Sequence, residues 1–210
     1  MTRFLGLVLL LSPAPVLASP ADLCDAAAEQ AAAENGVPLA LMRAVTRVET
    51  GRDNAPWPWT LNVGGQGQWF DTAEDAVAAA EQAVAEGVGQ VDLGCFQLNL
   101  RWHGARFADL AEMIDPTANA RHAARFLAEL HAETGDWREA AAAYHSRTPA
   151  LGEAYLTRLE AAHDADPLTG PPPPTALRAN GYPLLLAGQS GAVGSIVPQG
   201  RAMTPLIGAP

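Results

Sequence analysis

The chain has 210 residues, a formal net charge of −10 at pH 7, and 13 basic residues that are all arginine. Without lysine, Schiff-base catalysis and a Walker-type phosphate loop are excluded, because both need a lysine amine. The acidic balance without a basic cluster argues against nucleic acid or an anionic membrane as a partner.

The N-terminal residues have the pattern of a secretory signal peptide. Arg3 precedes the apolar run FLGLVLLL, and Ala18 is a suitable cleavage position. We therefore expect residues 1–18 to be removed and the mature chain to be exported to the periplasm. No later stretch has the roughly 20 apolar residues of a membrane span, so stable membrane insertion is not expected after cleavage.

The following segments predict a mainly helical domain over residues 19–166 with a small β region. Gly36 and Gly51 mark the ends of two helices, over 22–35 and 38–51. Residues 52–71 predict a loop or small hairpin. Later segments predict an extended stretch around 88–100 and helices over 72–87, 116–135, 136–144 and 150–163, the last with Leu151, Tyr155 and Leu159 on one face.

Glu49 has an unusual position on the second of these helices. At about 100° per residue it falls on the same face as Met42 and Val45, whereas Arg43 and Arg47 fall on the opposite side. Burying a carboxylate costs free energy unless it is partnered or protonated. Glu49 is therefore either a structural acid with a partner or an acid that keeps its proton near neutral pH.

The two cysteines, Cys24 and Cys95, predict a disulfide, because an exported chain meets an oxidising compartment. Such a bond would close a loop of about 70 residues and stabilise the fold by about 4 kcal/mol. The alternative is a pair of unpaired buried thiols.

Three further motifs place polar groups in otherwise small or apolar surroundings. Gln97 and Asn99 alternate with apolar residues, which would present both amides on one side of a strand. Tyr144 and Tyr155 each lie in a helical segment. Taken singly, the amides are compatible with a polar strand face and each tyrosine with core filling.

In this order the motifs resemble the lytic transglycosylase family, the SLT-type domains of the lysozyme superfamily, which cleave peptidoglycan. That family has Glu-Ser at a helix end, then G-x-x-Q with a following polar residue, then A-Y-N and a later tyrosine. The resemblance covers about residues 22–163 and implies a lysozyme-like helical domain. The matching residues here are Glu49-Thr50, Gly94 to Asn99, Ala143-Tyr144-His145 and Tyr155.

The resemblance implies that Glu49 protonates the glycosidic oxygen and then serves as a base, giving a 1,6-anhydromuramic end without a cofactor. It implies that Gln97 and Asn99 orient the substrate or Glu49, and that Tyr144 and Tyr155 shape the cleft. Two residues depart from the pattern. Thr50 replaces serine and keeps a hydroxyl for contact with substrate, whereas His145 replaces asparagine and lacks its amide.

Other residues leave alternatives open. A second carboxylate beside Glu49 would permit ordinary hydrolysis. Three tryptophans could either stack on sugar rings or anchor the loop over residues 52–71. The five histidines show no metal-binding motif, so no metal is expected. The carboxylate candidates are Asp53, Asp71 and Asp92; the tryptophans are Trp57, Trp59 and Trp69; the histidines are His103, His122, His131, His145 and His163.

Residues 167–210 contain 9 Pro and 7 Gly, a composition typical of disorder. Their apolar patches predict a tail that recruits a protein partner, and the resemblance favours the branch associated with the flagellum or with secretion. The sequence thus predicts a wall-cleaving transglycosylase. The alternatives are a hydrolytic muramidase and a non-catalytic peptidoglycan-binding or scaffold protein.

Overall fold

The computed structural model describes residues 19–52 and 55–166. The expected signal peptide, Asp53 and the expected C-terminal tail lie outside the described residues. None of the helices in the described part combines the length and the apolar composition that crossing a bilayer needs.

Local sequence signals set the first two helices. α1 (Pro20–Asn35) begins after Ser19, whose hydroxyl accepts the backbone N–H of Asp22, and it ends at Gly36 in the left-handed conformation. α2 (Leu39–Thr50) follows after three residues and carries Glu49 in its last turn. Both helices were predicted within a few residues.

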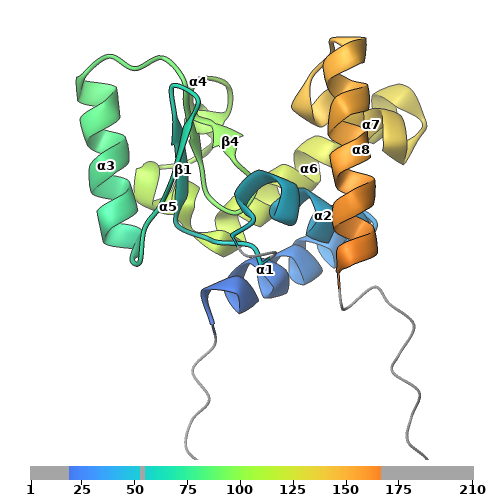
Figure 1. Cartoon of the computed structure of the whole chain (residues 1–210), viewed down its shortest axis with the longest axis horizontal. Coiled ribbons are helices and arrows are strands. Elements are labelled where there is room, and N and C mark those ends of the chain that lie inside the picture. The colour runs from blue at the N-terminus through green and yellow to red at the C-terminus, as the bar shows by residue number, and fades with distance from the viewer. Residues whose placement is uncertain (1–18, 53–54, 167–210) are drawn as a thin grey trace, which may run out of the picture. The chain divides into compact units, whose positions relative to one another are not determined.

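The predicted hairpin and extended stretch form one small antiparallel sheet. β1 (Thr60–Val63) pairs with β2 (Gln66–Trp69), and β1 also pairs with β3 (Val91–Leu93). β3 in turn pairs with β4 (Leu98–Asn99), which gives the strand order β2-β1-β3-β4. α3 (Ala73–Ala85) begins at the N-cap Thr72 and packs against β1 and β3, and Figure 1 shows it on the side of the sheet away from α8.

The remaining described chain is helical, which confirms a mainly α domain with a small β region. α6 packs against α1 and α7, and α8 packs against α2 and α7, as can be followed in Figure 1. The short helices between β4 and α6 were not predicted. The helices are α4 (Leu100–His103), the 3-10 helix η1 (Gly104–Arg106), α5 (Leu110–Ile114), α6 (Pro116–Thr134), α7 (Trp137–His145) and α8 (Pro149–Ala165).

Burial in the core does not follow the sequence periodicity of α2 and α8 at two positions. Arg47 is buried on the far side of α2, where its guanidinium bonds the carboxylates of Asp25 at 2.9 Å and Asp166 at 3.3 Å. Leu151 is 53% exposed, so only Tyr155 and Leu159 of the predicted stack are buried. In each case the neighbouring helices decide which face is covered.

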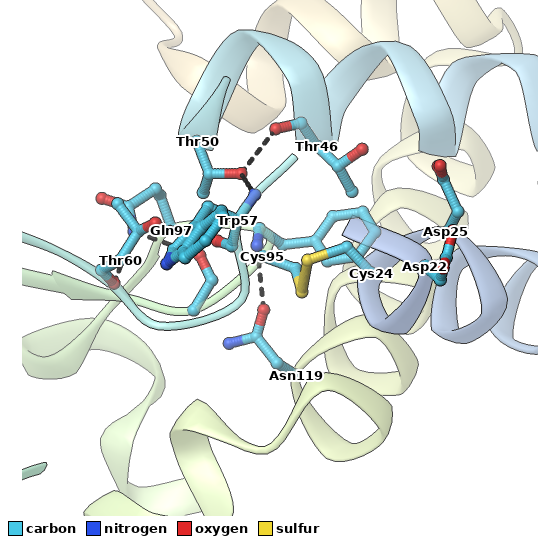
Figure 2. The surroundings of a disulfide bond; sticks show 12 residues. Asp22, Cys24, Asp25, Thr46, Thr50, Trp57, Thr60, Cys95, Gln97 and Asn119 are labelled. Carbon is cyan, nitrogen blue, oxygen red and sulfur yellow. Dashed lines mark hydrogen bonds between the residues drawn. A yellow bond between two sulfur atoms is a disulfide. The ribbon is translucent and has the colours of Figure 1, made fainter. Parts of the chain in front are cut away.

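The predicted disulfide is present and joins α1 to the turn after β3. Figure 2 shows the bond between Cys24 and Cys95. Both residues are fully buried, and their Cα atoms are 5.7 Å apart. Asn119 of α6 supports the same turn, because its Oδ1 accepts the Phe96 N–H and its Nδ2 donates to the carbonyl of Leu93. The turn between β3 and β4 is thus attached to two helices.

Candidate functional site

A polar cavity of about 700 Å³ opens between the sheet and the C-terminal helices. The end of α2 supplies Glu49 to it, and β1, β3 and β4 supply one wall. α4, α6, the end of α7 and residues of the connections next to these elements supply the rest. The lining residues are Glu49, Asn62, Gln90, Asp92, Gln97, Leu98, Asn99, Trp102, His103, Phe126, Tyr144, His145 and Arg147.

Glu49 is a titratable group whose pKa this setting raises. Burial, with a smaller contribution from the nearby charge of Asp92, raises the pKa of Glu49 to about 7, against the lowering effects of a hydrogen bond from Tyr155 and of the Arg158 charge. The hydroxyl of Tyr155 donates to Glu49 Oε1 at 2.7 Å. Near neutral pH, Glu49 is therefore protonated in part of the molecules and ionised in the others.

The raised pKa predicts a stability cost that glutamine would remove. Between the ordinary carboxyl pKa and about 7, the folded chain holds a proton that the unfolded chain releases, so stability falls as pH rises through this window. Above it the cost reaches about 3 kcal/mol, at roughly 1.4 kcal/mol per pKa unit. We expect Glu49→Gln to unfold at higher urea concentration than wild type at pH 8 but at about the same concentration at pH 4.

This prediction would be contradicted if the stability difference between Glu49→Gln and wild type were the same at pH 4 as at pH 8. Glu81→Gln is the matched control, because Glu81 is exposed on α3. Its stability should follow that of the wild type at both pH values.

Tyr155 lies in α8 between two other side chains. The ring of His145 stacks flat on it, with centroids 4.5 Å apart and an interplanar angle of 4°. The Arg158 guanidinium lies 5.4 Å from the Tyr155 centroid. Burial, and the charge of Glu49, raise the pKa of the Tyr155 hydroxyl well above its ordinary value, so the hydroxyl stays protonated and donates to Glu49.

Tyr144 has a different partner. Its hydroxyl donates to the carbonyl oxygen of Phe96 at 2.8 Å, and its ring packs against Phe126, with centroids 5.6 Å apart. Tyr144 therefore connects the end of α7 to the turn after β3, while it also lines the cavity.

These different partners predict different effects of removing the two hydroxyls. Tyr155→Phe deletes a hydrogen bond to a charged group, which is worth about 1.5–3 kcal/mol, so the pKa of Glu49 should rise further. Activity at pH 7 should fall about tenfold to a hundredfold, with the basic limb of the pH profile moved to higher pH. Tyr144→Phe should lower activity without moving the basic limb of the pH profile. If both variants moved this limb to the same extent, the assignment of Tyr155 as the hydrogen-bond donor to Glu49 would be contradicted.

Gln97 reaches the cavity by a route that the sequence did not predict. It belongs to the turn between β3 and β4 and has a positive φ of 45°, so it is not part of an alternating strand. Its Nε2 donates to the carbonyls of Thr60 and Gly94, each at 3.1 Å. Gly94 has φ of 79°, and a Cβ there would meet Asn119 Nδ2 at 2.5 Å, which requires glycine at this position.

Asn99 and Asp92 form a hydrogen-bonded pair in the cavity wall. Asn99 Nδ2 donates to Asp92 Oδ1 at 2.6 Å, and Asn99 Oδ1 accepts the N–H of Arg101 at the start of α4. Burial raises the pKa of Asp92, against the lowering effect of this bond. Of the predicted second carboxylates, Asp92 shares the cavity with Glu49, whereas Asp71 is exposed and does not line it.

Thr50 does not line the cavity, which corrects its expected contact with substrate. It is 1% exposed. Its hydroxyl donates to the Thr46 carbonyl at 2.8 Å and accepts the Trp57 N–H at 3.1 Å; Figure 2 marks both hydrogen bonds as dashed lines. Its own carbonyl accepts the indole N–H of Trp69. Thr50 therefore holds the loop after α2 in place.

The three tryptophans of the β region are loop anchors in this structure. The indole N–H of Trp57 donates to the Phe70 carbonyl at 2.6 Å, and the ring of Trp57 meets that of Trp59 edge to face. Neither these two residues nor Trp69 line the cavity that contains Glu49. The packed-loop alternative is therefore the one that the geometry supports.

Sequence reasoning missed part of the cavity wall. A local signal exists for two of these residues, because Trp102 and His103 follow Asn99 by three and four positions. A short helix directly after the motif keeps such neighbouring residues at the same edge of the cavity. Cavity residues that come from segments far from this motif have no sequence pattern near it that would reveal them. The missed residues are Asn62, Gln90, Trp102, His103, Phe126 and Arg147.

Two histidines meet at the edge of the cavity. His103 Nδ1 and His122 Nε2 are 3.0 Å apart. Burial lowers the pKa of both rings, that of His122 to about 4, so the pair is neutral near pH 7. Within residues 19–52 and 55–166, no group of three or more His, Cys, Asp or Glu side chains could hold a metal ion.

Comparisons with protein-family models, with curated proteins and with solved structures found no match to the chain.

Proposed function

We propose that the chain is a periplasmic peptidoglycan lytic transglycosylase with a lysozyme-like, SLT-type domain. The observation that carries the proposal is one partly buried carboxyl, Glu49, with a pKa raised to about 7 in a polar cavity of about 700 Å³. The ordered resemblance of the Glu49, Gln97, Tyr144 and Tyr155 motifs to that family adds support.

In the first step the Glu49 proton passes to the glycosidic oxygen between N-acetylmuramic acid and N-acetylglucosamine. The bond from C1 of muramic acid to that oxygen breaks, and the N-acetyl oxygen of the same sugar bonds to C1 in its place. A pKa close to the ambient pH suits this transfer, because enough of the enzyme holds the proton and the proton is still acidic. The Tyr155 hydroxyl holds the carboxyl in place.

In the second step the Glu49 carboxylate takes the proton of the sugar's own 6-hydroxyl, and O6 displaces the N-acetyl oxygen at C1. The 6-hydroxyl is tethered to the reacting centre, so its effective concentration far exceeds that of free alcohol and it competes with water. The product has a 1,6-anhydromuramic end, and Glu49 regains its proton.

The same site favours one further candidate, a hydrolytic muramidase. Asp92 shares the cavity with Glu49 and could direct a water to C1, as the second carboxylate does in many glycosidases. A non-catalytic scaffold is the third possibility, in which the domain binds glycan without cleaving it.

Product analysis separates these candidates. Wall sacculi digested with the chain should give muropeptides that are lighter by one water than hydrolytic products when measured by mass spectrometry. Reducing-end products would replace the transglycosylase with the muramidase, and intact sacculi would favour the scaffold.

We also propose that the enzyme opens the wall locally for an envelope-spanning assembly such as the flagellum, with residues 167–210 recruiting a protein of that assembly. Deleting these residues should leave cleavage of isolated sacculi within about twofold, as expected for a segment that serves only recruitment. Co-purification of envelope proteins should decline in the same variant. Loss of cleavage on deletion would contradict this role.

A further inference from the structure

The last residue of α7, His145, covers one face of the Tyr155 ring. The two rings lie nearly parallel, with an interplanar angle of 4° and centroids 4.5 Å apart. Tyr155 is fully buried and does not line the cavity, whereas His145 is exposed and does. The imidazole is therefore the layer that separates this face of the Tyr155 ring from the cavity.

The packing of α7 on α8 brings the two rings together. The helices approach each other closely at Gly152, where an added Cβ would lie 3.1 Å from the Ala142 Cβ. Gly152 precedes Tyr155 by three residues, and Ala142 precedes His145 by three. Each ring thus lies about one helical turn from this contact, so the stack depends on the close approach of the two helices.

The ring nitrogens of His145 make no hydrogen bond to any residue within 19–52 and 55–166. Partial burial and the charge of Arg158 lower the pKa of the imidazole, so the ring is neutral near pH 7. A neutral ring without hydrogen bonds contributes through its flat surface, and aromatic rings in contact stabilise each other beyond the area that they bury.

Tyr155 transmits this contact to the acid. Its hydroxyl donates to Glu49 Oε1 at 2.7 Å. The hydroxyl is fixed to the ring, so a restraint on the ring also restrains the donor, and a hydrogen bond weakens steeply when donor and acceptor are misaligned. The asparagine that the resemblance predicts at position 145 has no ring that could supply this restraint.

We infer that His145 is a positioning residue for the proposed reaction, because its ring, stacked on Tyr155, holds the Tyr155 hydroxyl against the Glu49 carboxyl. This inference rests on the proposed function, in which Glu49 is the acid. His145 acts through Tyr155 and needs no contact with the glycan for this role.

The pKa of Glu49 measures this positioning without any cleavage. The probe is the Glu49 carboxyl carbon in the full chain labelled with ¹³C-glutamate, titrated by NMR between pH 4 and pH 9 and assigned by its absence in Glu49→Gln. His145→Ala should raise the pKa by about 0.4 to 1, because a poorly held hydroxyl stabilises the carboxylate less. His145→Phe, which keeps a flat ring, should leave it unchanged. Asp92 and Arg158, whose charges also act on Glu49, are present in every variant.

A double variant separates this route from other effects of the lost ring. In the Tyr155→Phe background there is no hydroxyl to hold, so His145→Ala should leave the pKa of Glu49 unchanged. A shift of the same size in both backgrounds would show that the imidazole acts by excluding water from Glu49, and it would overturn the inference. An unchanged or lower pKa in His145→Ala alone would overturn it as well.

The pH profile of muropeptide release repeats the comparison under turnover. His145→Ala should move the basic limb to higher pH and lower the rate at pH 7 about twofold to tenfold, and His145→Phe should behave like the wild type. His145→Asn should behave like His145→Ala. Wild-type behaviour of His145→Asn together with loss in His145→Phe would replace the stack with an amide contact.

His131→Ala is the matched control, because it also removes a stacked histidine. The His131 ring lies on that of Trp137 with centroids 3.9 Å apart, and neither residue lines the cavity that contains Glu49. This variant should leave both the pKa of Glu49 and the pH profile unchanged.

The outcomes also separate this inference from the proposed function. If the wild type cleaves sacculi and His145→Ala changes neither the pKa of Glu49 nor the pH profile, the positioning role is wrong and the transglycosylase stands. If the NMR titrations give the expected pattern and the wild type cleaves no sacculi, the positioning of Glu49 stands and the proposed activity is wrong.

Discussion

Glu49→Gln should reduce the release of soluble muropeptides from sacculi by about a hundredfold to ten-thousandfold, the usual contribution of a positioned general acid. Glutamine has nearly the same shape and can still accept the Tyr155 hydrogen bond, which is 2.7 Å long at Glu49. It holds no transferable proton, so both the protonation of the leaving oxygen and the later deprotonation of the 6-hydroxyl are lost. The measurement is the initial rate of muropeptide release at pH 7.

The control for this prediction is Glu81→Gln, which changes an exposed carboxylate on α3 and should cleave at the wild-type rate. The far-ultraviolet circular dichroism of Glu49→Gln should match that of wild type, because the substitution removes no packed volume. Wild-type cleavage by Glu49→Gln would exclude Glu49 as the acid and would remove the main support for the proposed function.

The second large effect is expected from removal of the disulfide. Replacing both Cys24 and Cys95 by alanine should lower the free energy of unfolding by about 4 kcal/mol, since the bond closes a long loop in the unfolded chain; the two residues are 71 positions apart. The turn that contains Cys95 also carries Gln97 and accepts the Tyr144 hydrogen bond. The variant should therefore lose order at the cavity as well as stability.

Urea unfolding of the two proteins, each with and without reductant, measures this effect. Reductant should destabilise the wild type to a similar extent and leave the double alanine variant unchanged. A difference below about 1 kcal/mol between the two proteins would show that the loop-closure term does not dominate here.

The positions of the longer elements could be predicted because their signals are local. Thr72 and Asp136 cap α3 and α7 through their own side chains, and Gly135 ends α6 with a left-handed φ. Such signals act between residues a few positions apart. α4 and α5 were missed because helices of four and five residues are too short to be stable without packing against neighbours.

The unusual position of the Glu49 carboxyl could also be predicted from the sequence. Glu49 falls on an apolar helix face by periodicity alone, and the structure places it in the polar cavity with its pKa raised by burial. The pairing of Cys24 with Cys95 was confirmed as well, since two cysteines permit only one intrachain bond.

Contacts between distant segments decided the rest of the site. Thr50 was expected at the substrate, yet the loop that returns to α2 takes both its hydroxyl and its carbonyl. Gln97 faces the cavity from a turn held by Asn119, not from a regular strand. Asn62, Asp92 and Asn99 lie opposite one another in the sheet because of strand register, and register is set by pairing between residues that are far apart in the sequence.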